Sequence, residues 1–268
     1  MSKQMTADEL NVHLKLSEDH LHEYYSEMAA GTPEQQKKAQ LLGYWLMDYI
    51  SFLRKEADFN PQKIIRYKRG SIVKAHLGYR IGSEEGGLHY GIVVDVNNLR
   101  SAQTVTIVPL TSVKATTDLE RLHPSKIYLG DEIYTGLKNK LTKTLSQAQA
   151  DIADVKSRLH ALQAQAPAVD TPEYTAWENA EHPALDAASN DINKIQLKIK
   201  NMLKQKAQLE KMKRGSIALV GQITTISKIR IYDPLYPSDV LSNIRVSNKA
   251  LDQIDAKIKE LYTNQQAP

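Results

Sequence analysis

The segment GSEEGGLHYGIVV, residues 82–94, places a single histidine between a glycine-rich loop and an apolar run. Its first three glycines reach backbone angles that other residues avoid, so a shaped loop is predicted before the histidine. The β-branched and apolar residues 90–96 are typical of a buried strand. His89 therefore stands where a loop enters a sheet, and an imidazole there accepts or donates a proton near neutral pH. The alternative is a hairpin histidine whose ring is satisfied by neighbouring backbone.

Short β-branched runs separated by glycine or asparagine turns fill residues 64–132, among them IVKAHL, YGIVVDV and TVTIVPL. This pattern is typical of a small antiparallel sheet or barrel. It stops after Tyr128 and resumes in SIALVGQITTISKIRI, residues 216–231. We therefore expect one β domain whose strands come from two separate parts of the chain.

Two runs of heptad-spaced apolar residues separate these groups of strands. The first consists of Leu141, Leu145, Ala148, Ile152, Val155, Leu159 and Leu162, and the second of Leu185, Ala188, Ile192, Ile195, Ile199, Met202 and Leu209. Joined by the alanine- and proline-rich stretch 164–183, they predict an antiparallel coiled-coil hairpin. Because the ends of such a hairpin lie close together, it fits into a loop of the β domain without disrupting that domain.

Helices are also predicted near both ends of the chain. Thr6 and Glu9 form a capping-box sequence for a helix over residues 6–29, and Thr32-Pro33 opens a second helix over residues 32–58. Ser247 is placed to cap a final helix. The predicted fold class is α+β, in four parts: an N-terminal helical region at 1–60, the first part of a small β-barrel at 61–132, the inserted coiled-coil hairpin at 133–213, and the second part of the barrel with a C-terminal helix at 214–268.

The composition excludes several kinds of site. The 268 residues include no cysteine, which rules out disulfides and thiolate metal sites. No apolar run approaches the roughly 20 residues that span a bilayer, and the N-terminal residues lack the apolar core of a secretion signal, so we expect a cytoplasmic protein with no membrane partner. His20 and His22 would face different directions on a helix and make a poor metal pair, and no glycine-rich nucleotide-binding motif occurs.

The net charge is only +4, but the basic residues are unevenly distributed. Residues 63–80 hold six bases and no acid beside the glycine-rich loop, which favours phosphate binding there. Residues 194–214 hold eight bases against one acid, Glu210. A charge run of the second kind is more often a solvated face, so it indicates a phosphate-binding surface less strongly.

Four blocks in chain order resemble the PemK/MazF family of bacterial toxins. They are Arg69-Gly70, the GSE-GG loop Gly82–Gly87, the PLTS strand end Pro109–Ser112, and the strand Gln222–Ile231, which reads QITTISKIRI. The resemblance implies an SH3-like barrel, a homodimer, and a metal-independent endoribonuclease without a cofactor. Its expected partners are RNA, as the substrate, and a cognate antitoxin protein that restrains the activity.

The resemblance also implies a set of site residues. In the family, an arginine implicated in catalysis begins the strand after the mobile loop, and here His89 occupies that position. RNA cleavage by the ribose 2′-hydroxyl needs a proton acceptor, a role that suits histidine better than arginine, which stays protonated. Thr111 matches a threonine of the family's site, and TSVK resembles a T-S-x-K stretch of the related ToxN toxins, whose active-site lysine corresponds to Lys114. The expected catalytic residues are His89, Thr111 and Lys114, and the expected substrate-binding residues are Ser83, Ser112, Lys74, Gln222 and Thr224.

A second interpretation stays open beside the enzyme. Without the family's arginine, the chain is also consistent with a catalytically inactive RNA- or protein-binding module on the same barrel, in which the coiled coil is the functional element. The retained TSVK stretch and a histidine in the arginine's place favour the enzyme.

Overall fold

The computed structural model describes residues 4–264 and divides the chain into two compact units. One unit takes in the chain up to Phe59 together with the loop Leu77–Gly87. The other takes in Asn60–His76 and the chain from Leu88 onward. The glycine-rich loop is thus grouped with the N-terminal helices and apart from the strands that it joins in sequence.

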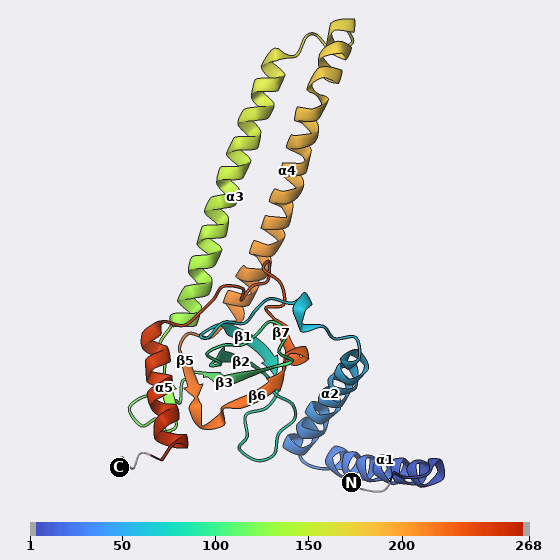
Figure 1. Cartoon of the computed structure of the whole chain (residues 1–268), viewed down its shortest axis with the longest axis vertical. Coiled ribbons are helices and arrows are strands. Elements are labelled where there is room, and N and C mark those ends of the chain that lie inside the picture. The colour runs from blue at the N-terminus through green and yellow to red at the C-terminus, as the bar shows by residue number, and fades with distance from the viewer. Residues whose placement is uncertain (1–3, 265–268) are drawn as a thin grey trace. The chain divides into compact units, whose positions relative to one another are not determined.

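The first unit is built on two helices that contact each other, α1 (Ala7–Ala30) and α2 (Pro33–Glu56) (Figure 1). Each begins with a complete capping box, from Thr6 and from Thr32. The box at Thr6 is predicted from the sequence, and Thr32-Pro33 is the predicted start of the second helix. Neither helix buries a residue. The loop of this unit contacts α1 through a hydrogen bond between the phenol groups of Tyr79 and Tyr24, and burial raises the pKa of Tyr79.

The second unit contains an antiparallel sheet of seven strands. The strands are β1 (Ile72–His76), β2 (Leu88–Val93), β3 (Thr104–Ser112), β4 (Lys126–Tyr128), β5 (Ser216–Leu219), β6 (Thr224–Ser227) and β7 (Ile231–Asp233). They pair in the order β4-β5-β3-β2-β1-β7, and β6 pairs with the other end of β3. Strands from both predicted parts of the β region therefore form one sheet, and the α+β class is confirmed.

The predicted barrel, in contrast, is not closed by strand pairing. The two outer strands, β4 and β7, have three residues each and pair only with β5 and β1, so no ladder joins the two ends of the sheet. The strand β6 pairs with β3, and the strand β7 pairs with β1. Between these two strands the chain forms the short helix η3 (Lys228–Arg230). The prediction of a barrel was wrong on this point, because the pattern of short strands does not reveal which of them pair.

The core of the second unit lies between the sheet and the C-terminal helix α5 (Asn248–Tyr262). Leu251 and Ile254 of α5 pack with Ile72 of β1 and Ile92 of β2. The Ser247 hydroxyl accepts a hydrogen bond from the Ala250 amide, as expected of the predicted cap.

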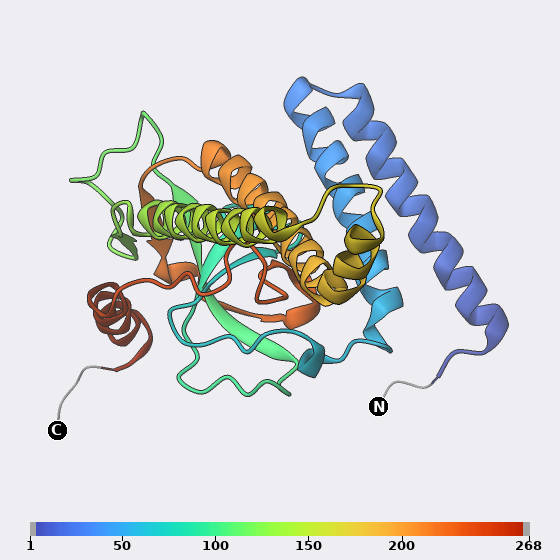
Figure 2. The ribbon, with the colours of Figure 1, turned by 90° about the horizontal axis from the view of Figure 1, so that it is seen from above.

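Two long helices, α3 (Glu132–Gln165) and α4 (Pro172–Lys211), follow β4 and precede β5 in the sequence and contact each other (Figures 1 and 2). Since β4 and β5 pair directly, the two ends of this helical pair meet at neighbouring strands. The connection between the helices is shorter than the predicted stretch 164–183. Thr171 caps α4 and Pro172 takes its first position, where a proline needs no amide partner, so the helix begins well before Pro183.

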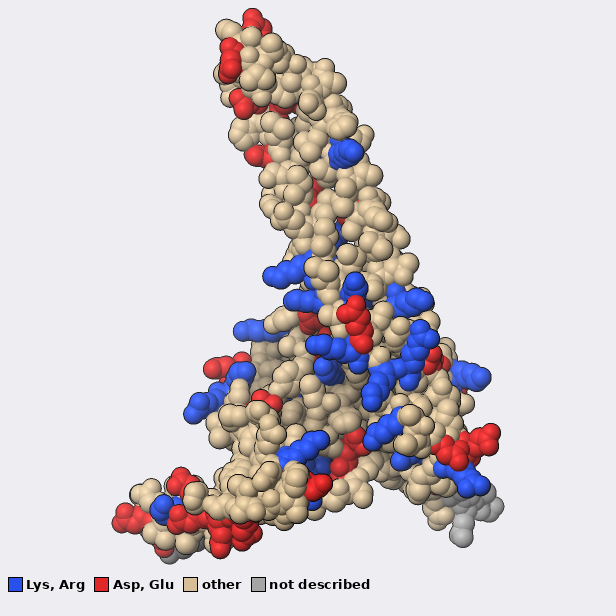
Figure 3. Space-filling model, turned by 180° about the vertical axis from the view of Figure 1, so that it is seen from behind, with Lys and Arg blue, Asp and Glu red and all other residues tan. Residues whose placement is uncertain are grey.

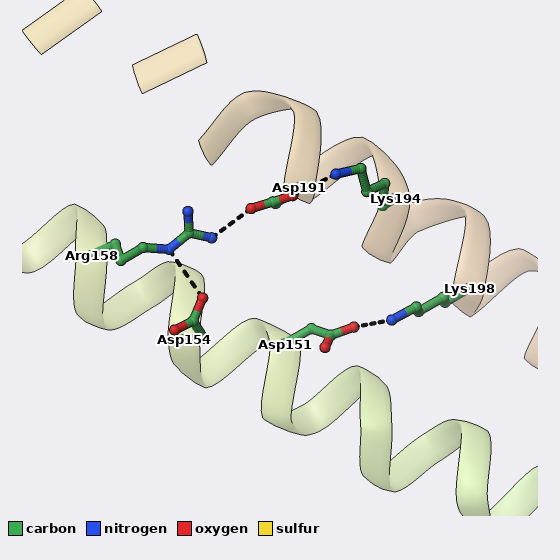
Figure 4. Close-up of polar contacts among 6 residues, drawn as sticks. All are labelled: Asp151, Asp154, Arg158, Asp191, Lys194 and Lys198. Carbon is green, nitrogen blue, oxygen red and sulfur yellow. Dashed lines mark hydrogen bonds and ion pairs between the residues drawn. The ribbon is translucent and has the colours of Figure 1, made fainter. Parts of the chain in front are cut away.

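The contacts between α3 and α4 are both apolar and ionic. Val155 of α3 packs with Ala188 and Ile195 of α4. Asp151 pairs with Lys198 across the interface, and Arg158 pairs with Asp191 (Figure 4). Asp151 and Arg158 lie seven residues apart on α3, and their partners Lys198 and Asp191 lie seven residues apart on α4 in the opposite direction. The two ion pairs therefore form in the same antiparallel register.

The first turns of α3 belong to the core of the sheet unit. Ile133 and Leu137 are buried. The Lys140 ammonium donates hydrogen bonds to the carbonyl oxygens of Asp239, Val240 and Ser242, at 2.7, 3.0 and 2.8 Å. The helical pair is therefore held to the rest of its unit by both packing and hydrogen bonds. None of the described helices has the length and apolar character needed to cross a membrane.

Candidate active site

A cavity of about 250 Å³ lies where β2 and β3 approach the end of α4. Its walls come from Leu88–Tyr90 of β2, Leu110–Ser112 of β3, Ile133 of α3, residues 211–213 at the end of α4, and Ser216 of β5. It contains three of the residues expected from the sequence, His89, Thr111 and Ser112. All of its walls belong to the second unit.

The pairing of β2 with β3 brings His89 next to Thr111. The two strands run antiparallel with Tyr90 opposite Leu110, so the next position along each strand sets His89 level with Thr111. Directly opposite residues of an antiparallel pair have Cβ atoms about 4.5–5.5 Å apart and share a face of the sheet. Continuing this register by one position sets the two residues opposite each other, and both line the same cavity.

One hydrogen bond defines the tautomer of His89. Its Nδ1 lies 3.1 Å from the carbonyl oxygen of Leu110. A carbonyl oxygen only accepts, so Nδ1 is the protonated nitrogen, and in the neutral ring Nε2 carries the lone pair. The backbone thus holds the imidazole in the form that accepts a proton at Nε2.

Three cavity residues that the sequence reasoning did not assign to the site are Tyr90, Lys211 and Lys213. Tyr90 follows His89, and its phenol accepts a hydrogen bond from the Gln208 amide of α4, while burial raises its pKa. The two lysines belong to the basic run at residues 194–214. That run is visible in the sequence, but its position beside β2 depends on how α4 returns to the sheet.

The other expected residues lie outside the cavity walls. Lys114 is exposed in a turn two residues beyond β3, where its amide donates to the Thr117 hydroxyl at 3.0 Å. Lys74, on β1 opposite Tyr90, has its ammonium 5.9 Å from the centre of the Tyr90 ring. Ser83 lies in the loop of the first unit.

Gln222 and Thr224 lie toward the other end of β3. Gln222 ends the short helix η2 (Val220–Gln222), and Thr224 begins β6. Thr224 pairs with Ile107, four positions before Thr111 along β3, which corresponds to about 13 Å at ~3.3 Å per residue. The structure therefore brings His89, Thr111 and Ser112 together in one cavity, and Lys74 lies next to the cavity residue Tyr90. Gln222 and Thr224 lie elsewhere in the sheet region.

Across residues 4–264, no group of three or more histidine, aspartate and glutamate side chains is arranged to hold a metal ion. The polar groups of the cavity are instead an imidazole, hydroxyls, a phenol and two ammonium groups. Such a set accepts and donates protons and binds anions.

Comparison with known proteins gives a match to a protein family. No curated protein sequence matches the chain. The matching family model covers β1 to β4 and most of α3, and its range includes His89, Thr111 and Lys114. The resemblance seen in the sequence is thereby confirmed: residues 68–163 match the family of PemK-like, MazF-like toxins of type II toxin-antitoxin systems.

Proposed function

We propose that this chain is the toxin of a type II toxin–antitoxin pair and cleaves RNA by attack of the ribose 2′-hydroxyl, without a metal ion. One observation carries the proposal: His89 of β2 and Thr111 of β3, two strands that pair, line one cavity, and both fall within the range that matches the toxin family. A proton acceptor beside a hydroxyl is the arrangement that cleavage by an internal nucleophile requires.

The proposed reaction begins with proton transfer to His89. Its Nε2 accepts the proton of the 2′-hydroxyl, and the 2′-oxygen then forms a bond to the adjacent phosphorus. The bond from phosphorus to the 5′-oxygen breaks, and this oxygen takes a proton from a water molecule. The hydroxide left behind takes the proton from His89 Nε2, which restores both the water and the neutral imidazole. The products are a 2′,3′-cyclic phosphate and a 5′-hydroxyl, so the reaction needs no other reactant.

The neighbouring hydroxyls support the same step. Thr111 and Ser112 line the cavity beside His89, and their hydroxyl groups are suited to donate to the non-bridging oxygens of the phosphate. We propose that Lys74 and Lys114 hold phosphates of the same strand outside the cavity. Ser83, Gln222 and Thr224 are proposed as contacts to more distant nucleotides.

The family match also supports proposals about the assembly. A type II system implies a protein antitoxin, and we propose that it binds this chain and blocks cleavage. We further propose a cytoplasmic homodimer, a sheet that is an open variant of the SH3-like barrel, and an inserted coiled coil formed by α3 and α4.

The test is cleavage of a mixed RNA pool by the purified protein in EDTA, with both new ends identified. The proposal expects cuts at a limited set of sequences that leave 2′,3′-cyclic phosphate and 5′-hydroxyl ends. Cleavage that requires magnesium, or that leaves a 3′-hydroxyl, would contradict the mechanism. RNA that is bound and stays intact would support the alternative of a binding module without catalysis.

A further inference from the structure

The cavity contains two positive side chains, and both come from the end of α4. Lys211 is the last residue of the helix, and Lys213 follows it by two positions. Among the described residues that line the cavity, no other lysine or arginine is present. Among the lining side chains, therefore, only this segment offers a lysine to a phosphate that enters beside His89 and Thr111.

These two lysines differ from other lysines of the same helix. Lys194 and Lys198 form ion pairs with Asp191 and Asp151, and Lys206 lies 3.9 Å from Glu210. Within the described part of the chain, the ammonium groups of Lys211 and Lys213 have no acidic or hydrogen-bonding partner. Two unneutralised ammonium groups at one cavity form a binding site for an anion.

The segment that carries the lysines is fixed from both sides. Gln208 donates to the phenol of Tyr90, and Met212 packs against the core of the sheet. Gly215 then turns the chain into β5 with φ of +79°, and a Cβ at this position would lie 2.8 Å from Cγ2 of Val113. The lysine backbones are therefore held between an anchored helix end and a close-packed turn.

The charges along α4 change sign from the tip to the base. Residues 166–190, at the tip, contain five acids and no lysine or arginine, whereas residues 194–214 contain eight bases and one acid. In Figure 3, acidic groups lie at the tip of the helical pair, and basic groups gather around its base and over the adjoining surface. The end of the pair that carries positive charge is the end that reaches the cavity.

We propose that the end of α4 completes the active site, with Lys211 and Lys213 binding the phosphate of the RNA strand that lies against His89. This inference rests on the proposed function and adds a part of the chain that lies outside the family match, which ends at residue 163. The helical pair then contributes directly to RNA cleavage. Its two lysines neutralise the phosphate and the additional negative charge that develops during attack by the 2′-oxygen.

The test compares three proteins with the wild type. The first carries Lys211→Gln and Lys213→Gln, the second carries Lys211→Arg and Lys213→Arg, and the matched control carries Lys204→Gln, an exposed lysine of α4 outside the cavity walls. Single-turnover cleavage is measured on an RNA that the wild type cuts. Binding is measured by fluorescence anisotropy over a range of salt, with a copy of this RNA that lacks the reacting 2′-hydroxyl.

The Gln pair is expected to cut about 10–100-fold more slowly, and the salt slope of its binding should fall by about 0.7–1.4, the contribution of one or two phosphates on a single strand. The Arg pair keeps the charge and should stay near the wild type, as should the control. Equal melting temperatures of all four proteins would show that the loss is not caused by unfolding.

Other outcomes separate the inference from the proposed function. If the wild type cleaves and the Gln pair cleaves and binds equally well, the lysines do not bind the substrate and the inference is wrong. If the wild type binds RNA and does not cut a mixed pool, the proposed cleavage is wrong. The role of the lysines is then decided by the salt dependence of binding, measured with an oligonucleotide from the pool that the wild type binds. A wild type that neither binds nor cuts RNA overturns both.

Discussion

The Arg158 guanidinium of α3 and the Asp191 carboxylate of α4 form an ion pair across the two helices, with 2.6 Å between Nη2 and Oδ2 (Figure 4). Asp191 also accepts from Lys194 at 2.9 Å, and Arg158 also pairs with Asp154 on its own helix at 3.0 Å. Arg158 and Asp191 therefore take part in a network. Because each joins a partner on its own helix to one on the other, a slip of one helix along the other would break several contacts together.

The register should depend on the second cross-helix pair, Asp151 and Lys198. Asp151→Lys sets two ammonium groups against each other and should lower the melting temperature. Adding Lys198→Asp restores opposite charges in reversed order and should recover most of the loss, as measured by thermal denaturation followed by circular dichroism. An exchanged pair that is no more stable than the single variant would show that this contact does not set the register.

Acid should weaken the same network. The hydrogen bond from Lys194, followed by that from Arg158, lowers the pKa of Asp191, and Lys198 lowers the pKa of Asp151 in the same way. A lowered folded-state pKa adds stability that is complete above the ordinary aspartate pKa of 3.8 and disappears as the pH falls through the lower folded value. The wild type should thus melt above an Asp151→Asn, Asp191→Asn variant at pH 7, and the difference should shrink progressively as the pH falls below 3.8.

Removal of the imidazole of His89 should abolish most of the proposed cleavage. His89→Ala is expected to lower the single-turnover rate by roughly 10²–10⁴-fold, the usual contribution of a general acid or base, and to leave folding intact because the ring is only partly buried at a strand end. His160→Ala, an exposed histidine of α3, is the matched control. The measurement is the single-turnover cleavage rate of the wild type and of both variants under the same conditions.

His89→Arg provides a second comparison at the same position. An arginine stays protonated, so it would bind phosphate without accepting the proton of the 2′-hydroxyl. Partial activity of this variant would mean that charge matters more than proton transfer. A His89→Ala protein that cuts at the rate of the wild type would end the catalytic assignment of this residue.

The hydroxyl of Thr111 should have a smaller effect than His89. Thr111→Val keeps the β-branched shape that suits the strand and removes one hydrogen bond to the phosphate, a change of about 0.5–1.5 kcal/mol, or roughly two- to thirteenfold in rate. Thr111→Ser retains the hydroxyl and should recover the activity. A Val variant without a rate defect, together with unchanged RNA affinity, would remove Thr111 from the site.

Two truncations of the helical pair should have opposite outcomes. Deletion of residues 150–199 with a short glycine linker joins α3 and α4 at nearly level positions and keeps Lys140, Gln208 and Lys211. This protein should fold and cleave RNA. Deletion of residues 138–211 removes the Lys140 ammonium from three carbonyl oxygens, and each buried polar group that loses its partner costs about 1–3 kcal/mol, so lower stability is expected in urea denaturation. Equal stability of the two truncated proteins would contradict this role of Lys140.

Local signals in the sequence predict much of the fold. Thr6 with Glu9 predicts a helix start from neighbouring residues alone, and this capping box is present. Thr32-Pro33 marks the start of α2 in the same way. The heptads predict two long helices for the same reason, since their period depends only on the chain itself. The position of His89 between a loop and a strand follows from the glycine-rich segment before it and the apolar run after it, whereas its place in one site with Thr111 was predicted only through the family resemblance.

Long-range relations account for what the sequence leaves undetermined. Whether β4 and β7 meet depends on the path of the chain between them, and the composition of neither strand records it. The position of Lys213 likewise depends on the Gln208–Tyr90 contact, which joins residues 118 positions apart. The alanines and prolines of residues 164–183 also suggested a long connection between the helices. Pro172 takes the first position of α4 and Pro183 lies inside it, and composition does not distinguish such prolines from those of a loop.

The opposite charges at the two ends of the helical pair have a kinetic consequence. The whole chain carries a formal net charge of only +4, so a distant polyanion is attracted weakly by the total charge. At closer range, the acidic tip of the helical pair repels the polyanion, and the lysine-rich end beside the sheet attracts it. The electric field therefore exerts a torque that turns the lysine-rich end toward the polyanion. Arrival at the base should therefore be faster than random collision predicts, and this advantage should fade as salt shortens the Debye length from about 10 Å at 0.1 M to about 3 Å at 1 M.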